Sequence, residues 1–129
     1  MSKPNKGYLD LVVWQKSMEL AKTIYDVTKQ FPKEEQYGLT QQIKRSAVSI
    51  PSNIAEGSAR NSMKEFKQFL AIASGSAAEL KTQLLLSESF GFLGEDQTRF
   101  VIKIVDEVAR MLYGLSASLE SNQQLTTNN

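Results

Sequence analysis

The chain has 129 residues, 41% of them hydrophobic, and a formal net charge of +1. This length predicts one domain that is large enough to bury a core. The sequence contains neither cysteine nor histidine, which excludes disulfides, thiolate nucleophiles, Cys/His zinc sites and histidine acid–base catalysis. No stretch has the pattern of a signal peptide or of a membrane span, so we expect a cytoplasmic protein.

The first helical pattern covers residues 8–31 and follows a short polar segment, residues 1–7, that we expect to be a flexible tail. Its apolar residues form two stripes about 100° apart on the helix surface. One stripe consists of Leu11, Trp14, Met18, Ala21 and Tyr25. The other consists of Val13, Leu20, Ile24, Val27 and Phe31. One stripe is enough for packing in a bundle, so the second predicts another contact, with a further helix of the bundle or with another subunit.

The second helical pattern, residues 39–57, is unusual because it continues through Pro51. Its apolar stripe extends on both sides of the proline and consists of Ile43, Ala47, Ile50 and Ile54. A proline inside a helix lacks an N–H group and crowds the carbonyl four residues earlier, which costs about 3 kcal/mol unless the helix bends. We therefore predict a kinked helix whose apolar stripe is buried.

The third helix is predicted at residues 63–89, where Ser62 and Glu65 form a capping-box pattern. Its apolar residues step by four and three and are Phe66, Leu70, Ala73, Ala77, Leu80 and Leu84. Gly75 lies in a central segment of small residues, AIASGSAAE. Since glycine weakens a helix by about 1 kcal/mol relative to alanine, we expect a neighbouring helix to approach closely at Gly75.

The fourth helix is predicted at residues 96–119, after a short turn at residues 90–94. Its stripe consists of Val101, Ile104, Val108, Met111 and Leu115. Residues 121–129 are polar and uncharged, and we expect a flexible tail there. Four helices of about 20–27 residues joined by short connections predict an all-α fold, an antiparallel up-down-up-down four-helix bundle over residues 8–120.

The sequence does not favour catalysis or metal binding. Metal sites in bundles typically use Glu and Glu-x-x-His, and the acidic residues of this chain mostly lie beside the apolar stripes. Ser46, Ser49 and Ser52 have no histidine base to activate them. We interpret them as small residues that allow close packing or bond to helix carbonyls at the kink. We expect no metal, no cofactor and no enzymatic activity.

Basic residues suggest a different kind of site. Five of them lie in the second helix and around the turn into the third: Lys44, Arg45, Arg60, Lys64 and Lys67. If these helices are antiparallel neighbours, Arg60 and Lys64 share one end and the first two lie further away. Such a patch predicts weak, salt-sensitive and sequence-independent contacts with phosphates. The alternative, favoured for a monomer, is a solvated face balanced by acidic residues; repetition in an oligomer would favour nucleic acid.

The run IKRSAVSIPSNIAEGSARNSMKEFKQFLAIASGSAAELKTQL resembles the core of the small proteins encoded within intervening sequences of bacterial 23S rRNA genes, the S23 family. The resemblance covers about residues 9–120, and its most specific part is the string IPSNIAEG. It implies a four-helix bundle that assembles into a homopentamer. It also implies kinship with accessory proteins of diversity-generating retroelements, which resemble basic barrels that contact nucleic acid and a reverse transcriptase.

The near-neutral charge of this chain separates it from those retroelement relatives and argues against strong nucleic-acid binding. Self-assembly is the family property that this chain is more strongly expected to share. The family motif includes Pro51, Asn53, Glu56 and Gly57, and we expect these residues to hold the kinked helix against a neighbour. Our leading hypothesis is a non-enzymatic oligomeric adaptor that binds RNA, or DNA, weakly through repeated basic residues. The alternative is a scaffold that docks a partner enzyme without binding nucleic acid.

Overall fold

The computed structural model describes residues 7–128, with side chains described for residues 7–120. Four α-helices make up most of this part of the chain: α1 (Val12–Val27), α2 (Leu39–Ser58), α3 (Met63–Ser89) and α4 (Glu95–Asn128). Three short 3-10 helices accompany them: η1 (Gly7–Asp10), η2 (Thr28–Gln30) and η3 (Lys33–Glu35). The described residues form no strand.

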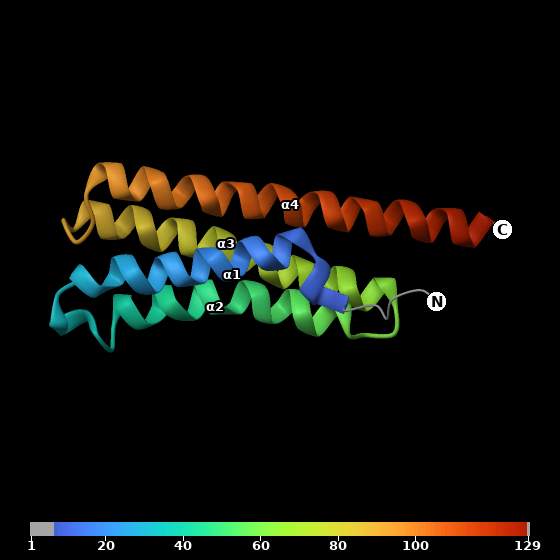
Figure 1. The fold of residues 1–129 in the computed structure, drawn as a ribbon, viewed down its shortest axis with the longest axis horizontal. Coiled ribbons are helices and arrows are strands. Elements are labelled where there is room, and N and C mark those ends of the chain that lie inside the picture. Colours follow the sequence, from blue (N-terminus) through green and yellow to red (C-terminus); the bar gives the residue numbers. More distant parts are fainter. Residues whose placement is uncertain (1–6, 129) are drawn as a thin grey trace.

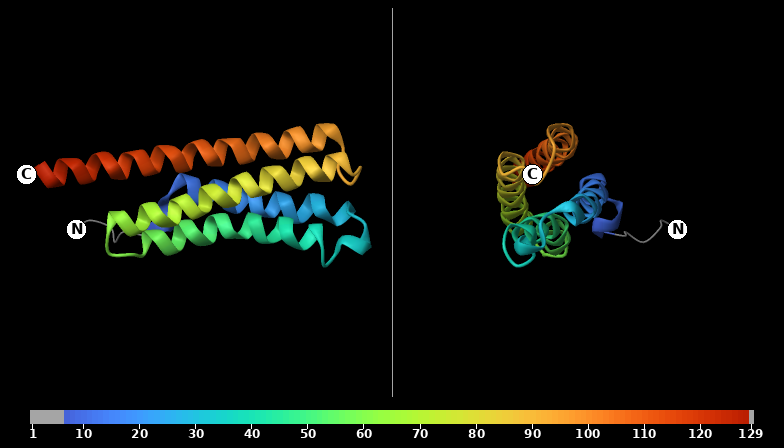
Figure 2. Two further views of the ribbon diagram at one scale, coloured as in Figure 1. Left: turned by 180° about the vertical axis from the view of Figure 1, so that it is seen from behind. Right: turned by 90° about the vertical axis from the view of Figure 1, so that its left-hand side faces the viewer.

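The helices lie side by side along one long axis, and the chain reverses direction at each connection between them (Figure 1). Figure 2 shows the bundle end-on. In it α1 packs against α2 and α4, and α3 packs against the same two helices. Therefore α1 and α3 occupy opposite corners. The predicted all-α four-helix bundle is confirmed.

The predicted first helix is too long at both ends. It begins only after Leu11, whose backbone is extended, because η1 precedes it. At its other end the chain tightens into η2 and then extends at Phe31 (φ −67°, ψ 152°). Pro32 accounts for that extension, since the ring of a proline disfavours helical geometry in the residue before it.

The predicted end of the fourth helix, at residue 119, is wrong. α4 continues to Asn128, because residues 121–128 contain neither glycine nor proline to stop it. The backbone there is helical rather than the tail that polarity suggested; Asn129 lies outside the described residues. The predicted tail at residues 1–7 also lies outside them, except Gly7, which begins η1. The last turns of α4 extend beyond the other helices (Figure 1).

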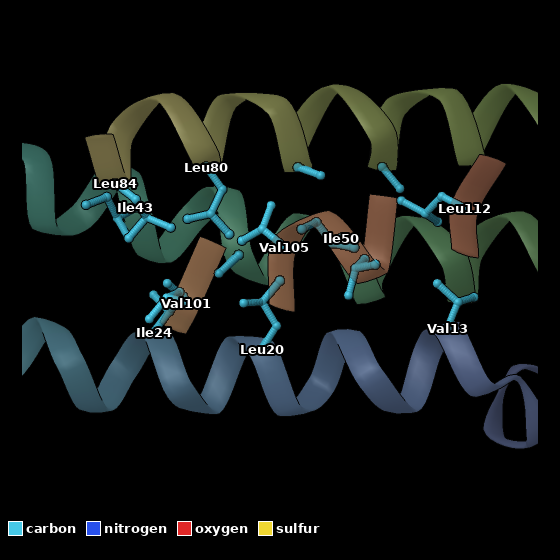
Figure 3. Close-up of a cluster of buried hydrophobic side chains, with 14 of the residues drawn as sticks. Val13, Leu20, Ile24, Ile43, Ile50, Leu80, Leu84, Val101, Val105 and Leu112 are labelled. Atoms are coloured by element: carbon cyan, nitrogen blue, oxygen red, sulfur yellow. The ribbon is translucent and has the colours of Figure 1, made fainter. Parts of the chain in front are cut away.

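The core follows the predicted stripes closely. Ile43, Ala47, Ile50 and Ile54 of α2 are fully buried. They meet large buried side chains from the other three helices, among them Leu20, Ile24, Leu80, Leu84, Val101, Val105 and Leu112 (Figure 3). Fully burying such a side chain stabilises the fold by about 1.5–3 kcal/mol. This shared core fixes which faces of the helices remain at the surface.

Pro51 lies inside α2, which is α-helical on both sides of it, and its side chain is buried. The helix therefore continues through the proline as predicted. The bend itself remains a prediction.

Glycines mark one close approach between helices, but not the one predicted. A Cβ atom on Gly57 would lie 2.6 Å from the Cβ of Phe69 and 3.3 Å from the carbonyl oxygen of Phe66, so α2 and α3 meet tightly there. Gly75 is exposed, and a Cβ on it would meet nothing within 4 Å. The close helix neighbour predicted at Gly75 is therefore absent from the described part of the bundle.

Candidate functional site

The five basic residues predicted to bind nucleic acid fall into two separate groups. Lys44 and Arg45 lie in the first half of α2, whereas Arg60 lies just after its end. Sixteen residues of helix separate Lys44 from Arg60, which corresponds to about 24 Å. The ammonium of Lys44 lies 4.7 Å from the centroid of the Tyr25 ring, on the side of α1. Arg45 instead lines a groove between α2 and α3.

The second group, at the turn between α2 and α3, is partly neutralised. Arg60 pairs with Glu56 at 2.8 Å and lies over the Phe69 ring. Lys67 pairs with Glu120 of α4 at 3.4 Å. Lys64 is exposed. Among the described residues, three of the five predicted cations have no carboxylate partner; they are Lys44, Arg45 and Lys64.

A row of hydrogen bonds joins α2 to α3 of the same chain, and Asn53 of the family motif supports it from within α2. Asn53 donates hydrogen bonds from Nδ2 to the carbonyl oxygen (2.8 Å) and the hydroxyl (2.9 Å) of Ser49. That hydroxyl lies 2.7 Å from the Ser76 hydroxyl on α3. One turn earlier, Ser46 donates to Glu79 at 3.3 Å. We call this row of hydrogen bonds the polar seam; two of its serines reach across to α3 instead of bonding back to α2.

An apolar groove that the sequence did not indicate as a site lies between α1 and α2. Its volume is about 670 Å³, within the range of pockets that hold small molecules or side chains of a partner. We call it the α1/α2 groove; its lining includes Trp14, Met18, Ala21, Tyr25, Val48 and Pro51. Four of these six, Trp14, Met18, Ala21 and Tyr25, belong to the first of the two apolar stripes predicted on the first helix. The second stripe, for which the sequence predicted an additional contact, lies in the core of the bundle, with Val13, Leu20, Ile24 and Phe31 buried. That the first stripe lies opposite Pro51 could be seen only in the fold.

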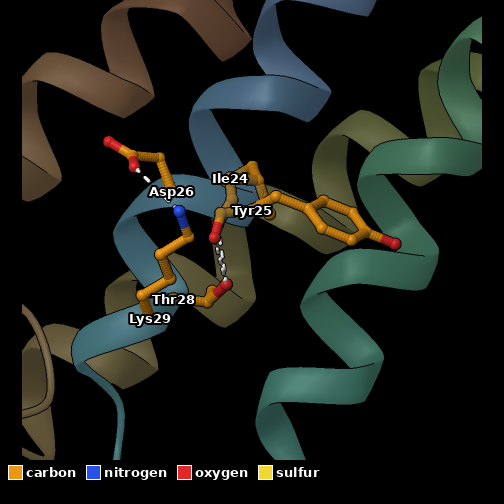
Figure 4. A network of polar contacts seen from close by, with 5 residues as sticks. All are labelled: Ile24, Tyr25, Asp26, Thr28 and Lys29. Carbon is orange, nitrogen blue, oxygen red and sulfur yellow. Dashed lines mark hydrogen bonds and ion pairs between the residues drawn. The ribbon is translucent and has the colours of Figure 1, made fainter.

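Charged side chains surround the α1/α2 groove. Lys29 pairs with Asp26 at 3.7 Å, and the Tyr25 ring extends toward α2 (Figure 4). In the same turn the Thr28 hydroxyl donates a hydrogen bond to the carbonyl of Ile24 at 2.8 Å. Lys22 also lines the groove and has no ion-pair partner among the described residues. The groove thus combines an apolar floor with a rim that carries positive charge.

Within residues 7–128 no cluster of three or more acidic side chains has the arrangement of a metal site. The same residues include no helix with the length and apolar character needed to cross a bilayer.

These features define a small four-helix bundle whose distinctive sites are a polar seam and an apolar groove. The family model described as 23S rRNA-intervening sequence protein matches residues 9–114, and the chain belongs to this family. It is also similar to the crystal structure of a protein with unknown function from the S23 ribosomal protein family of Bacteroides thetaiotaomicron. The two share 27% sequence identity with a TM-score of 0.76, over 81% of this chain and 98% of the other. No curated protein shows significant similarity to the sequence.

Proposed function

We propose that this chain is a non-enzymatic, cytoplasmic protein that assembles into oligomers and binds RNA weakly through its phosphates. The observation that carries the proposal is the set of cations on α2 and α3 without carboxylate partners among the described residues: Lys44, Arg45 and Lys64. Cations that are not already paired gain most from a phosphate, because no existing ion pair has to break first.

Self-assembly is what makes so few cations sufficient. The affinity of a protein for nucleic acid depends on the number of phosphates neutralised, and three cations on a chain of net charge +1 give weak binding. Repetition around an oligomer presents several copies to one RNA, which raises the overall affinity without new contacts. The family resemblance favours five copies.

A protein-binding scaffold is the second candidate. The α1/α2 groove supports it, because a groove of about 670 Å³ lined mainly by apolar side chains suits an apolar face of a partner enzyme. Under this hypothesis the cations are an ordinary solvated surface.

Gel mobility shifts with an RNA hairpin, and with a DNA duplex of the same sequence, test the first proposal across a salt series. We expect binding at low salt that weakens steeply as salt rises. The double variant Arg45→Glu, Lys64→Glu should bind at least tenfold more weakly. The double variant Lys103→Glu, Arg110→Glu is the matched control, since both residues are exposed on α4 and the net charge changes by the same amount, and it should bind like the unmodified chain.

Absence of binding at low salt would overturn the RNA proposal and favour the scaffold. Equal weakening by the control would show that only net charge matters, which contradicts a role for α2 and α3. The DNA duplex separates a preference for RNA from general phosphate binding.

A further inference from the structure

The surface of α3 that faces away from the bundle is almost uncharged. Between residues 68 and 89 the exposed residues include a single charged side chain, Glu79. The others are Gln68, Ala71, Ile72, Ser74, Gly75, Ala78, Thr82, Leu85, Leu86 and Ser89. Lys81, whose side chain is 44% exposed, pairs with Asp106 of α4. Helix faces in water normally carry many charged residues. We call this surface the α3 outer face.

The α3 outer face has the composition of a helix-packing surface. Ile72 and Leu86 are 52% and 44% exposed. Small residues lie between them on the same face. Gly75 lies among them with open space around its Cβ position. A glycine that weakens its helix and relieves no contact within the chain is expected where another helix approaches from outside.

The α1/α2 groove is the second unfilled apolar surface of the same chain, and it is on another side of the bundle. Trp14, Met18 and Pro51 form part of its floor. Since α1 and α3 occupy opposite corners of the bundle, the α3 outer face of one molecule cannot reach its own groove. It can reach the groove of another copy.

The charges at the two surfaces are complementary. Lys22 lies at the rim of the groove and has no carboxylate partner in the described part of the chain. Glu79, the one charge of the α3 outer face, accepts a hydrogen bond from Ser46 but pairs with no cation there. We propose that the α3 outer face of one copy docks into the α1/α2 groove of the next copy.

This contact joins two different surfaces, so it is heterologous, and repetition of one heterologous contact closes into a ring when the rotation permits. The inference rests on the self-assembly part of the proposed function and adds the pair of surfaces that meet. Isologous pairing, in which the same surface of both copies meets itself, would produce a dimer instead.

Two variants, each blocking one surface, test the pairing by light scattering coupled to size-exclusion chromatography. Gly75→Glu places a charge on the α3 outer face, where a new side chain meets nothing within 4 Å. Val48→Glu places one in the α1/α2 groove at a position that is 42% exposed. Each variant alone should be monomeric. An equimolar mixture should form dimers and nothing larger, since one variant keeps its groove and the other keeps its face.

Phe100→Glu is the control, because Phe100 is exposed on α4 outside both surfaces, and it should assemble like the unmodified chain. Circular dichroism checks that each variant remains folded; if Gly75→Glu does not fold, Ala78→Glu blocks the same exposed face. A charge exchange gives an independent measurement. Lys22→Glu should weaken association at least tenfold, and adding Glu79→Lys should restore it.

The outcomes separate this inference from the proposed function. An unmodified chain that is monomeric at micromolar concentration would overturn self-assembly and the pairing together. An oligomer that tolerates both blocking variants would overturn the pairing alone and leave the groove to a helix of another protein. Monomeric variants whose mixture stays monomeric would also overturn it, because the blocked surfaces would then not be each other's partners.

Discussion

Gly57 is the residue at which the packing of α2 against α3 has the least tolerance. A Cβ atom there would lie 2.6 Å from the Cβ of Phe69, a distance at which the backbone of one helix must move. The polar seam lies along the same pair of helices, so small side chains and direct hydrogen bonds act together. The side-chain amide of Asn53 donates its hydrogen bonds to Ser49. These two side chains therefore need no larger polar partner where α2 and α3 lie close together.

We predict that Gly57→Ala destabilises the fold by about 1–3 kcal/mol, the usual cost of overpacking a tight contact. Gly114→Ala is the matched control, because Gly114 also lies within a helix and a Cβ on it meets nothing within 4 Å. That substitution should stabilise the chain by up to about 1 kcal/mol. Urea unfolding followed by circular dichroism measures both; equal effects would show that the contact with Phe69 is not limiting.

Ser62 should be needed for the start of α3. Its hydroxyl accepts a hydrogen bond from the backbone N–H of Glu65 at 3.1 Å and lies 3.4 Å from the Glu65 carboxylate. Replacing an N-cap serine with alanine typically costs about 0.5–2 kcal/mol, so Ser62→Ala should lower the unfolding midpoint accordingly. Ser89→Ala, at the exposed far end of α3, should change it by less than about 0.5 kcal/mol.

The helices were predictable where local chemistry defines their ends. The predicted range of α3 agrees with the structure because a cap at Ser62 and a regular apolar stripe both mark it. Boundaries were missed where local signals are weak. Residues 120–128 contain no glycine or proline that would stop a helix, yet their one apolar residue, Leu125, makes no stripe that would require one. At the start of α1, the helical pattern was extended to residue 8, but residues 7–10 form the 3-10 helix η1, whose tighter winding the periodicity does not reveal.

Substitution of Pro51 separates the contribution of α2 to the stability of the fold from its contribution to the α1/α2 groove. Pro51 is buried within α2 and also lines the α1/α2 groove. We predict that Pro51→Ala stabilises the isolated chain by about 1–3 kcal/mol, because it restores a backbone donor and removes the clash of the ring. Oligomers should weaken, because the shape of the groove changes. Urea unfolding and light scattering measure the two effects. If neither the stability nor the oligomer changes, Pro51 has no role in either.

At the scale of the whole molecule, the candidate site was the least predictable part. The sequence places five cations in α2 and around the turn into α3, but it does not show which of them are paired with residues far away in the chain. Lys67, for example, pairs with Glu120 of α4, and no sequence pattern around either residue predicts this contact. The presence of two apolar stripes on α1 did indicate an extra contact. What it could not indicate is that α2 contributes Val48 and Pro51 to the same groove.

RNA binding and self-assembly should respond differently to salt. Phosphate contacts weaken steeply as salt rises because counterions are released on binding, whereas the proposed contact between copies depends mainly on apolar surface. We predict that between about 0.05 and 0.5 M salt RNA affinity falls by at least about 100-fold, while the oligomer persists. Light scattering and gel shifts on the same samples measure this. Dissociation in parallel with RNA release would contradict an apolar interface.

The single tryptophan of the chain lies in the α1/α2 groove, with the Tyr8 ring at 5.2 Å between centroids. Indole emission shifts to shorter wavelength when water is excluded, so this chain carries its own optical reporter on the surface in question. Diluting the protein through its dissociation range should move the emission of Trp14 to the red, with no added dye and no substitution.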